Sequence, residues 1–142
     1  MRDDPLQIAR EVSEAWSTIY FHAHPTFTVD LSHQSVRALQ YVALTEAPTV
    51  GGVAHHLGVR HHTASEIVAR LEDKGLAQRS RGSSDRRRVT LELTAAGVAA
   101  LGEHTGPDPD AIAEALASAS PRERREIESA FASLLALVQS RR

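Results

Sequence analysis

In the segment RHHTASEIVARLEDKGLAQRSRGSSDRRRVTLELT, residues 60–94, a helical pattern is followed at once by an alternating one. In the first half, apolar residues recur at helical spacing, at Ala64, Ile67, Val68 and Leu71. Gly75 then stands where a glycine commonly ends a helix. The first half therefore predicts a helix that ends at Gly75.

The second half predicts two short strands, over residues 76–81 and 88–93. The sequence RVTLEL alternates, with Val89, Leu91 and Leu93 on one face of the expected strand. The intervening RGSSD consists largely of turn-forming residues, so it joins the two strands as a hairpin loop.

A shorter helix is expected just before residue 60. TVGGVAHHLGV, residues 49–59, starts with the capping residue Thr49, directs Val53, Ala54 and Leu57 inward and reaches Gly58 at its end. Two helices joined by a tight turn, the second polar on one face, are typical of a helix-turn-helix. The hairpin that follows them is then a wing.

Helical patterns account for most of the remaining chain. They predict a helix over about 5–22, a second one capped by Asp30 or Ser32, a third capped by Thr94, a short piece around 112–116 and a final helix to Val138. The sequence HTGPDPD interrupts the third, and Ser120, Pro121 and Glu123 give the last one a capping box. We therefore expect a mainly α protein with a small β-wing.

The last expected helix carries a wide apolar stripe for a chain end. Its members are Ile127, Ala130, Phe131, Leu134, Leu135 and Val138. A stripe of this width needs an apolar partner, which is either the rest of one chain or a second copy.

Composition narrows the class of protein. The chain has 142 residues, the size of one domain, and no cysteine, which excludes disulfides and thiolate metal sites. It contains no apolar run near eighteen residues, and its polar start, MRDDPLQIAR, is unlike a signal peptide. We therefore expect a cytoplasmic protein with no membrane partner.

Charge is distributed unevenly along the chain. Between Val53 and Leu93, eight Lys and Arg oppose five Asp and Glu, a balance of +3 within a chain of formal net charge -2. A short hairpin cannot bury so many charges, so its arginines are solvated or are used on a polyanion such as DNA. Beside a helix-turn-helix we favour DNA phosphates or the minor groove, with Asp85 orienting a guanidinium. The arginines concerned are Arg79, Arg81, Arg86, Arg87 and Arg88.

These residues carry a resemblance to a known family. DRRRVTLELTAAG resembles the wing signature of the MarR family of winged helix-turn-helix regulators. LGVRHHTASEIVARLEDKGLAQR is similar to that family's recognition-helix segment, with Leu71, Gly75 and Leu76 at its end. The residues that match the wing signature are Asp85, Arg87, Leu93, Thr94 and Gly97.

The resemblance implies a single domain over residues 1–142. A DNA-binding winged helix-turn-helix lobe would cover approximately residues 32–94, and helices within 1–30 and 95–142 would form a dimerisation region. It further implies a homodimer on a pseudo-palindromic operator in double-stranded DNA, acting as a repressor or, less often, an activator.

The start of the second helix of a helix-turn-helix reaches the base edges. Glu66 departs from the neutral or basic residue usual in the family, and would repel phosphate unless it accepts from cytosine or pairs with His62. Arg60 departs as well, because it stands where a capping Ser or Thr is typical. The candidate DNA-reading residues are Arg60, His61, His62, Thr63, Ser65 and Glu66.

The resemblance also implies a small-molecule effector, often a phenolic or aromatic anion, in a cleft beside the dimer helices. Trp16 and Tyr20 stand one turn apart on a helix, a spacing that more often reflects packing than a ligand wall. The GPDP break departs from the long helix that the family shows there. The matching residues are Trp16, Tyr20, His33 and Arg37.

Eight histidines raise the alternative of a metal-responsive regulator. The pairs His55-His56 and His61-His62 are adjacent, so on a helix their side chains diverge by about 100° and seldom hold one ion. The sequence contains no pair of histidines four residues apart. We therefore predict no metal site and no cofactor.

An enzyme and a protein–protein interaction module are the two alternative classes of function. An enzyme is disfavoured because the sequence has no cysteine, phosphate-binding glycine loop, His-x-x-x-His pair or nucleophile elbow. A protein–protein interaction module that kept the winged-helix shape and lost specific DNA binding is favoured by Glu66 and the acidic body of the chain.

Overall fold

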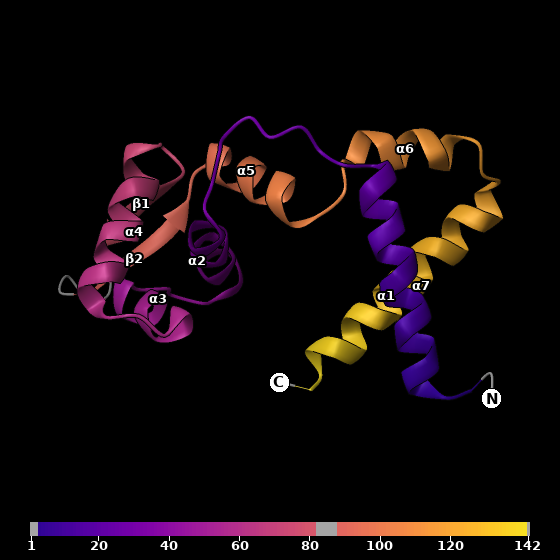
Figure 1. Ribbon diagram of the computed structural model, residues 1–142, viewed down its shortest axis with the longest axis horizontal. Helices are drawn as coiled ribbons and strands as arrows, with labels where there is room; N and C mark the ends of the chain where they lie inside the picture. Colours follow the sequence, from indigo (N-terminus) through magenta and orange to yellow (C-terminus); the bar gives the residue numbers. More distant parts are fainter. Residues whose placement is uncertain (1–2, 82–87, 142) are drawn as a thin grey trace. The chain divides into compact units, whose positions relative to one another are not determined.

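The computed structural model describes residues 3–81 and 88–141, which form seven α-helices and one two-stranded sheet (Figure 1). The chain divides into two compact units: unit 1 is Met1–His24 with Pro107–Arg142, and unit 2 is Pro25–Gly106. The mainly α class with a small β-hairpin is confirmed. The elements are α1 (Pro5–His22), α2 (His33–Leu44), α3 (Val50–Leu57), α4 (His61–Asp73), β1 (Ala77–Arg81), β2 (Val89–Leu93), α5 (Ala95–Thr105), α6 (Pro109–Ala117) and α7 (Pro121–Gln139).

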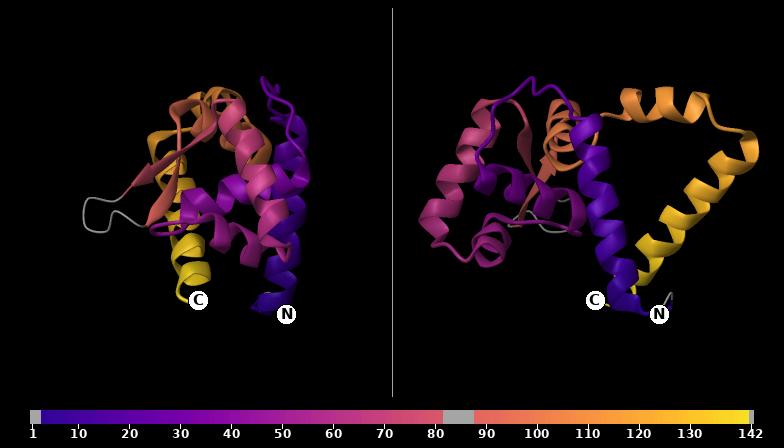
Figure 2. Two further views of the ribbon diagram at one scale, coloured as in Figure 1. Left: turned by 90° about the vertical axis from the view of Figure 1, so that its left-hand side faces the viewer. Right: turned by 45° about the vertical axis from the view of Figure 1, so that its right-hand side comes forward.

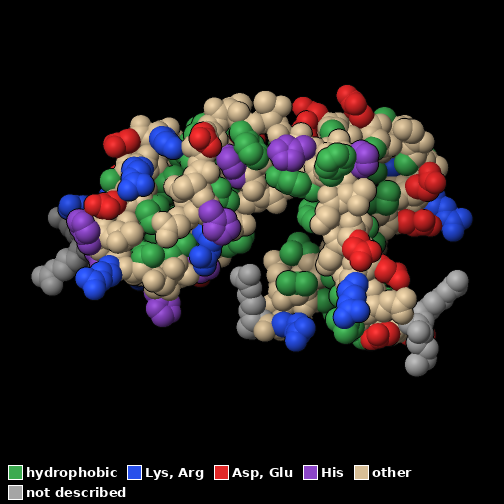
Figure 3. All heavy atoms as spheres, viewed as in Figure 1, with side chains coloured by type: hydrophobic (Ala, Val, Ile, Leu, Met, Phe, Trp, Pro, Cys, Tyr) green, Lys and Arg blue, Asp and Glu red, His purple; other side chains and the backbone are tan. Residues whose placement is uncertain are grey.

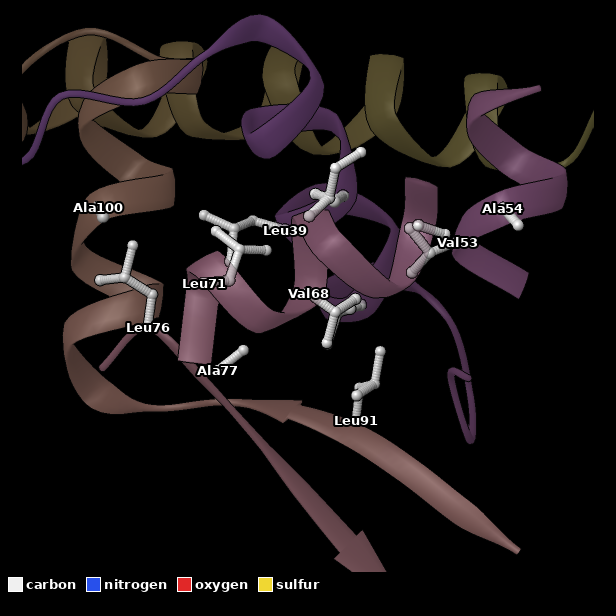
Figure 4. Close-up of a cluster of buried hydrophobic side chains, with 13 residues drawn as sticks. Leu39, Val53, Ala54, Val68, Leu71, Leu76, Ala77, Leu91 and Ala100 are labelled. Carbon is white, nitrogen blue, oxygen red and sulfur yellow. The ribbon is translucent and has the colours of Figure 1, made fainter. Parts of the chain in front are cut away.

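Unit 2 has a closed hydrophobic core. Helices α2, α3 and α4, the hairpin and α5 all direct apolar side chains into it (Figure 4). Burying a large aliphatic side chain contributes about 1.5–3 kcal/mol, so this cluster is the main source of stability in the unit. The largest fully buried side chains are Leu39, Leu71, Leu76, Val53 and Val68.

Local capping chemistry sets where the helices of unit 2 begin and end. Ser32 caps α2, Thr49 caps α3 and Thr94 caps α5, each hydroxyl accepting from the amide three residues on. Gly58 follows α3 with φ 67°, in the left-handed region that glycine adopts without steric cost. These starts and the Gly58 end are those that the sequence predicts, with Ser32 rather than Asp30 as the cap of α2.

The two strands pair antiparallel, with Ala77 opposite Leu93 and Arg81 opposite Val89 (Figure 2). Leu91 is buried, and its amide also donates to the carbonyl of Pro48 at 2.8 Å, which fastens the loop before α3 to the hairpin. The predicted hairpin is confirmed, each strand being one residue shorter at its start than expected.

Gly97 lies where the chain returns from the hairpin to α5. A Cβ on Gly97 would overlap the carbonyl oxygen of Leu76 and lie 2.9 Å from its carbon. The same oxygen accepts from the amide of Thr94 at 3.1 Å, so it cannot move without losing a hydrogen bond. The close approach of two backbones gives a physical reason for glycine at this position.

Unit 1 contains α1, α6 and α7 and has a different character. Among its described residues, none in these three helices is buried. Helices α1 and α7 meet at Trp16 and Phe131, whose ring centroids are 5.6 Å apart. The predicted capping box is present at the start of α7, where Ser120 and Glu123 bond each other's backbone amides.

The predicted interruption after residue 101 is also present. Helix α5 ends at Thr105, and α6 begins at Pro109 with Asp108 as its cap. Helix α5 lies in unit 2, because Gly97 and Ala100 are buried against the core there. The compact unit therefore extends beyond residue 94, and the assignment of helices within 95–142 to a dimerisation region stays a prediction.

Candidate nucleic-acid interface

Helix α4 has one face in the core and one in solvent. Ala64, Ile67, Val68 and Leu71 are buried, which fixes the rotation of the helix about its axis. Of the predicted DNA-reading residues, Arg60, His61, His62 and Glu66 are exposed, and Thr63 and Ser65 are half-buried. Arg60 takes the N-cap position that the sequence indicated.

The turn between α3 and α4 is tight. The amide of Val59 donates to the carbonyl of Ala54 at 3.0 Å, directly after the left-handed Gly58. Helix α4 then begins at His61. The two helices and this turn form the predicted helix-turn-helix, and β1 and β2 follow it in the chain.

His62 and Glu66 lie one turn apart on α4, and their side chains contact each other. Nε2 of His62 lies 3.2 Å from Oε1 of Glu66, and the two side chains are 84% and 52% exposed. The pairing of Glu66 with His62 was one of the two roles that the sequence left open for this carboxylate.

The hairpin places some of its arginines in solvent. Arg81 and Arg88 are exposed at the end of the strand pair. Arg79 instead donates from Nε to Oε1 of Glu72 at 2.9 Å and is 44% exposed, so part of its hydrogen-bonding capacity is used within the chain. The predicted residues Asp85, Arg86 and Arg87 lie outside the described residues.

Arg70 belongs to the same surface, although the sequence did not single it out. It is exposed and follows Glu66 by four residues, as Glu66 follows His62. We call His62, Glu66 and Arg70 the outer stripe of α4. The sequence could have indicated Arg70, because residues four apart on a helix lie on the same face and Arg70 continues the spacing of His62 and Glu66.

Charged side chains of both signs and histidines surround this part of unit 2 (Figure 3). Glu72 is paired with Arg79, and Lys74 donates from Nζ to the carbonyl of Asp30 at 2.9 Å. Glu66, unlike Glu72, is an exposed carboxylate within the outer stripe itself.

The predicted ligand residues fall in different units. In unit 1, Trp16 packs on Phe131, and the ring of Tyr20 lies 4.9 Å from that of His24. In unit 2, His33 starts α2, and Arg37 donates to the carbonyl of His56 at 3.3 Å. A shared ligand site for these four residues stays a prediction.

Several histidines take part in packing. His104 stacks on Phe27 with centroids 4.1 Å apart, and its Nε2 lies 2.8 Å from the carbonyl oxygen of Val29. His56 stacks on Tyr41 at 5.4 Å. Within residues 3–81 and 88–141, no three His, Asp or Glu side chains are grouped as a metal site would require.

None of the helices in the described part of the chain is both long enough and apolar enough to span a membrane.

Comparison with known proteins agrees with this geometry. A family model described as the MarR family matches residues 29–88, which contain α2, the helix-turn-helix and β1. Residues 29–88 of this chain are thus similar to the MarR family. The match confirms the resemblance that the wing and recognition-helix residues indicated. A search of curated proteins found no match.

Solved structures extend the MarR-like fold over most of the chain. The transcriptional regulator Tm0710 of Thermotoga maritima is 18% identical with a TM-score of 0.66, the match covering 95% of this chain and 96% of that one. FabT of Streptococcus pneumoniae, solved in complex with DNA, is 19% identical with a TM-score of 0.57 over 98% of this chain and all (100%) of its own. PcaV of Streptomyces coelicolor, solved with its natural ligand, is 20% identical with a TM-score of 0.51 over 98% and 94%.

Proposed function

We propose that this MarR-family chain is a transcriptional regulator that binds a specific double-stranded DNA sequence as a homodimer. The observation that carries the proposal is the rotation of α4. Its apolar face is buried in a helix-turn-helix, which leaves the outer stripe exposed on the helix that enters the major groove in such motifs. The DNA-bound structure of FabT, which shares the fold, supports this assignment.

The hairpin would contact the DNA backbone beside α4. Arg81 and Arg88 are exposed at one end of the strand pair, and Arg86 and Arg87 follow in the sequence between them. Guanidinium groups bind phosphate oxygens bidentately, and such contacts fix the register of a protein on the duplex. We propose that the wing supplies affinity and that α4 supplies sequence preference.

A second copy of the chain would cover the apolar surface of unit 1. Helices α1 and α7 line an apolar groove of about 750 Å³ that includes Trp16, Phe131 and Leu135. Leu135 is 58% exposed and Leu137 66%, which is unusual for aliphatic side chains in a folded soluble domain. A two-fold dimer buries the same patch on both copies and sets the spacing of two recognition helices.

Release from DNA by a small molecule completes the proposal, with the chain acting as a repressor. PcaV was solved with its natural ligand and MepR of S. aureus with ethidium bromide, and both share this fold. A ligand acts in this way only when it binds one dimer geometry more tightly than the other. Trp16, Tyr20, His33 and Arg37 are the residues we propose for this site.

Titration of a fluorescent duplex with the chain at two salt concentrations tests DNA binding. The duplex is taken from the region upstream of the chain's own gene, with a random duplex beside it. We expect binding that weakens as salt rises, and Arg88→Ala should weaken binding to both duplexes and lower the salt slope by about one.

Arg125→Ala is the matched control, because Arg125 is an exposed arginine on α7 in unit 1. It should leave the salt slope as it is. A chain that binds neither duplex at low salt would favour the protein–protein interaction module instead.

A further inference from the structure

Glu66 is the acidic residue of the outer stripe of α4. DNA carries a negative charge on every phosphate, so a carboxylate on the DNA-facing helix weakens binding unless it has a specific use. Glu66 stands in the second turn of α4, near the helix start that reaches base edges. Its side chain is 52% exposed, so burial does not withdraw it from that surface.

The other carboxylates of α4 differ from Glu66 in position. Glu72 is held by Arg79 at 2.9 Å and is 31% exposed, and Asp73 is the last residue of the helix. Both lie at the C-terminal end, away from the turns that enter the groove. Glu66 is thus the carboxylate of α4 that is placed to meet a base.

Base chemistry then selects one partner. In the major groove, cytosine presents the N4 amino donor, which a carboxylate accepts. Adenine also presents an amino donor, but beside it stands the N7 acceptor, which repels a second carboxylate oxygen. Guanine presents two acceptors and thymine an acceptor and a methyl group. An ionised Glu66 therefore favours cytosine over the other three bases.

His62 holds the carboxylate in place. Its Nε2 lies 3.2 Å from Oε1 of Glu66, one turn earlier on the same face. An ionised carboxylate has about four acceptor positions, so this contact leaves capacity for an amino group of DNA. A contact that restricts the rotamers of Glu66 lowers the entropy that the side chain loses when it meets a base.

We propose that Glu66 is a specificity-determining residue that selects a cytosine in each half-site, and that His62 is the residue that positions its carboxylate. The inference rests on the proposed function, since it assumes that α4 lies in the major groove. It gives a role to the residue whose negative charge would otherwise weaken DNA binding.

Selection from a random duplex library with the full-length chain tests this inference. The wild type should enrich one sequence with a cytosine at a fixed position of each half-site, preferred over adenine by about tenfold. Glu66→Gln should change that position toward adenine, because a glutamine amide pairs with adenine N6 and N7. Glu66→Ala should accept all four bases there, and the other positions should keep their preferences.

Asp73→Asn is the matched control, because it removes the same charge from the same helix. It should raise affinity for all duplexes slightly and leave every base preference unchanged. If Glu66→Ala keeps the preferences of the wild type at every position, the role of Glu66 is overturned while DNA binding stands. If the wild type enriches no sequence, the proposed function itself fails, and the inference fails with it.

Two substitutions of His62 test whether it positions the carboxylate of Glu66. His62→Gln keeps a neutral nitrogen donor near the position of Nε2, whereas His62→Ala removes it. We expect the glutamine variant to retain the cytosine preference and the alanine variant to lose most of it. Equal cytosine preference in the two variants would overturn the role of His62.

Discussion

Unit 2 and unit 1 are both built mainly from helices but bury their apolar residues to very different degrees. In unit 2, Leu39 and Val53 are fully buried in one core shared by four helices and the hairpin. In unit 1, Phe131 is 47% exposed and Leu135 58%, although both stand on the apolar side of α7. Unit 2 therefore has a closed hydrophobic core, whereas the apolar face of unit 1 is left exposed in the single chain.

The contrast separates two tasks within one chain. A closed core holds α4 and the hairpin rigidly, which a DNA-reading surface needs. An open apolar face gains its stability only when another surface covers it, so its state depends on protein concentration. We infer that unit 2 folds from its own contacts and that unit 1 is completed by the second copy.

The largest expected difference in the free energy of unfolding is between two leucine-to-alanine substitutions, one in the core of unit 2 and one on the apolar face of unit 1. Leu39→Ala leaves a cavity in a closed core and should lower the free energy of unfolding by about 2–5 kcal/mol. Leu135→Ala removes a side chain that is 58% exposed in one chain and should cost far less at protein concentrations where the chain is monomeric. Urea unfolding of both variants at low concentration measures the difference.

The destabilisation caused by these two substitutions should depend differently on protein concentration. The cost of Leu135→Ala should grow as the wild type becomes dimeric, whereas the cost of Leu39→Ala should stay nearly constant. Equal costs at every concentration would mean that unit 1 is complete without a partner.

Gly97→Ala tests how closely the core of unit 2 is packed. The added methyl overlaps the carbonyl of Leu76, so the backbone must shift, at a cost of about 1–3 kcal/mol. Gly102→Ala in the same helix is the control, since a Cβ there meets no described atom within 4 Å. Thermal unfolding should place the control at or above the wild type, and two equal midpoints for the variants would refute the close approach.

Leu135→Glu tests the open face of unit 1 directly. A charge in the centre of an apolar interface should raise the dimer dissociation constant at least about tenfold. Ser129→Glu adds the same charge to α7 outside its apolar stripe and should leave association nearly unchanged. Analytical ultracentrifugation measures both, and similar dissociation constants would place the interface elsewhere.

The smallest effect concerns the start of α7. Hydrogen bonds from the backbone and side chain of Ser120 lower the pKa of Glu123 below its usual value of 4.5. A lowered folded pKa means that the stabilisation is present above pH 4.5 and is lost as the pH falls through the folded pKa. Melting temperatures between pH 7 and 3 should therefore fall slightly more for the wild type than for Glu123→Gln. Parallel pH profiles of the two proteins would contradict the capping box.

Local chemistry explains which features the sequence could predict. The side chains of four capping residues each accept from an amide only three residues away, so a short window contains the whole interaction. These residues are Ser32, Thr49, Thr94 and Ser120. The alternation at residues 89–93 likewise shows one buried face within five residues.

Features that depend on distant residues were not predictable in the same way. The pairing of Arg79 with Glu72 depends on how β1 leaves α4, and it reduces the free arginines of the wing by one. The place of α5 in unit 2 depends on Ala100 meeting the core of distant helices. The roles of the candidate DNA-reading residues depend on a partner, DNA, that the chain alone does not contain.

In the proposed regulator, two copies joined through unit 1 present two α4 helices to one duplex. Sedimentation of the chain with a labelled operator duplex, combined with footprinting of the same complex, measures whether they do. We expect two protomers per duplex and two protected half-sites about one helical turn apart. One protomer per duplex with a single protected site, or no complex at low salt, would contradict it.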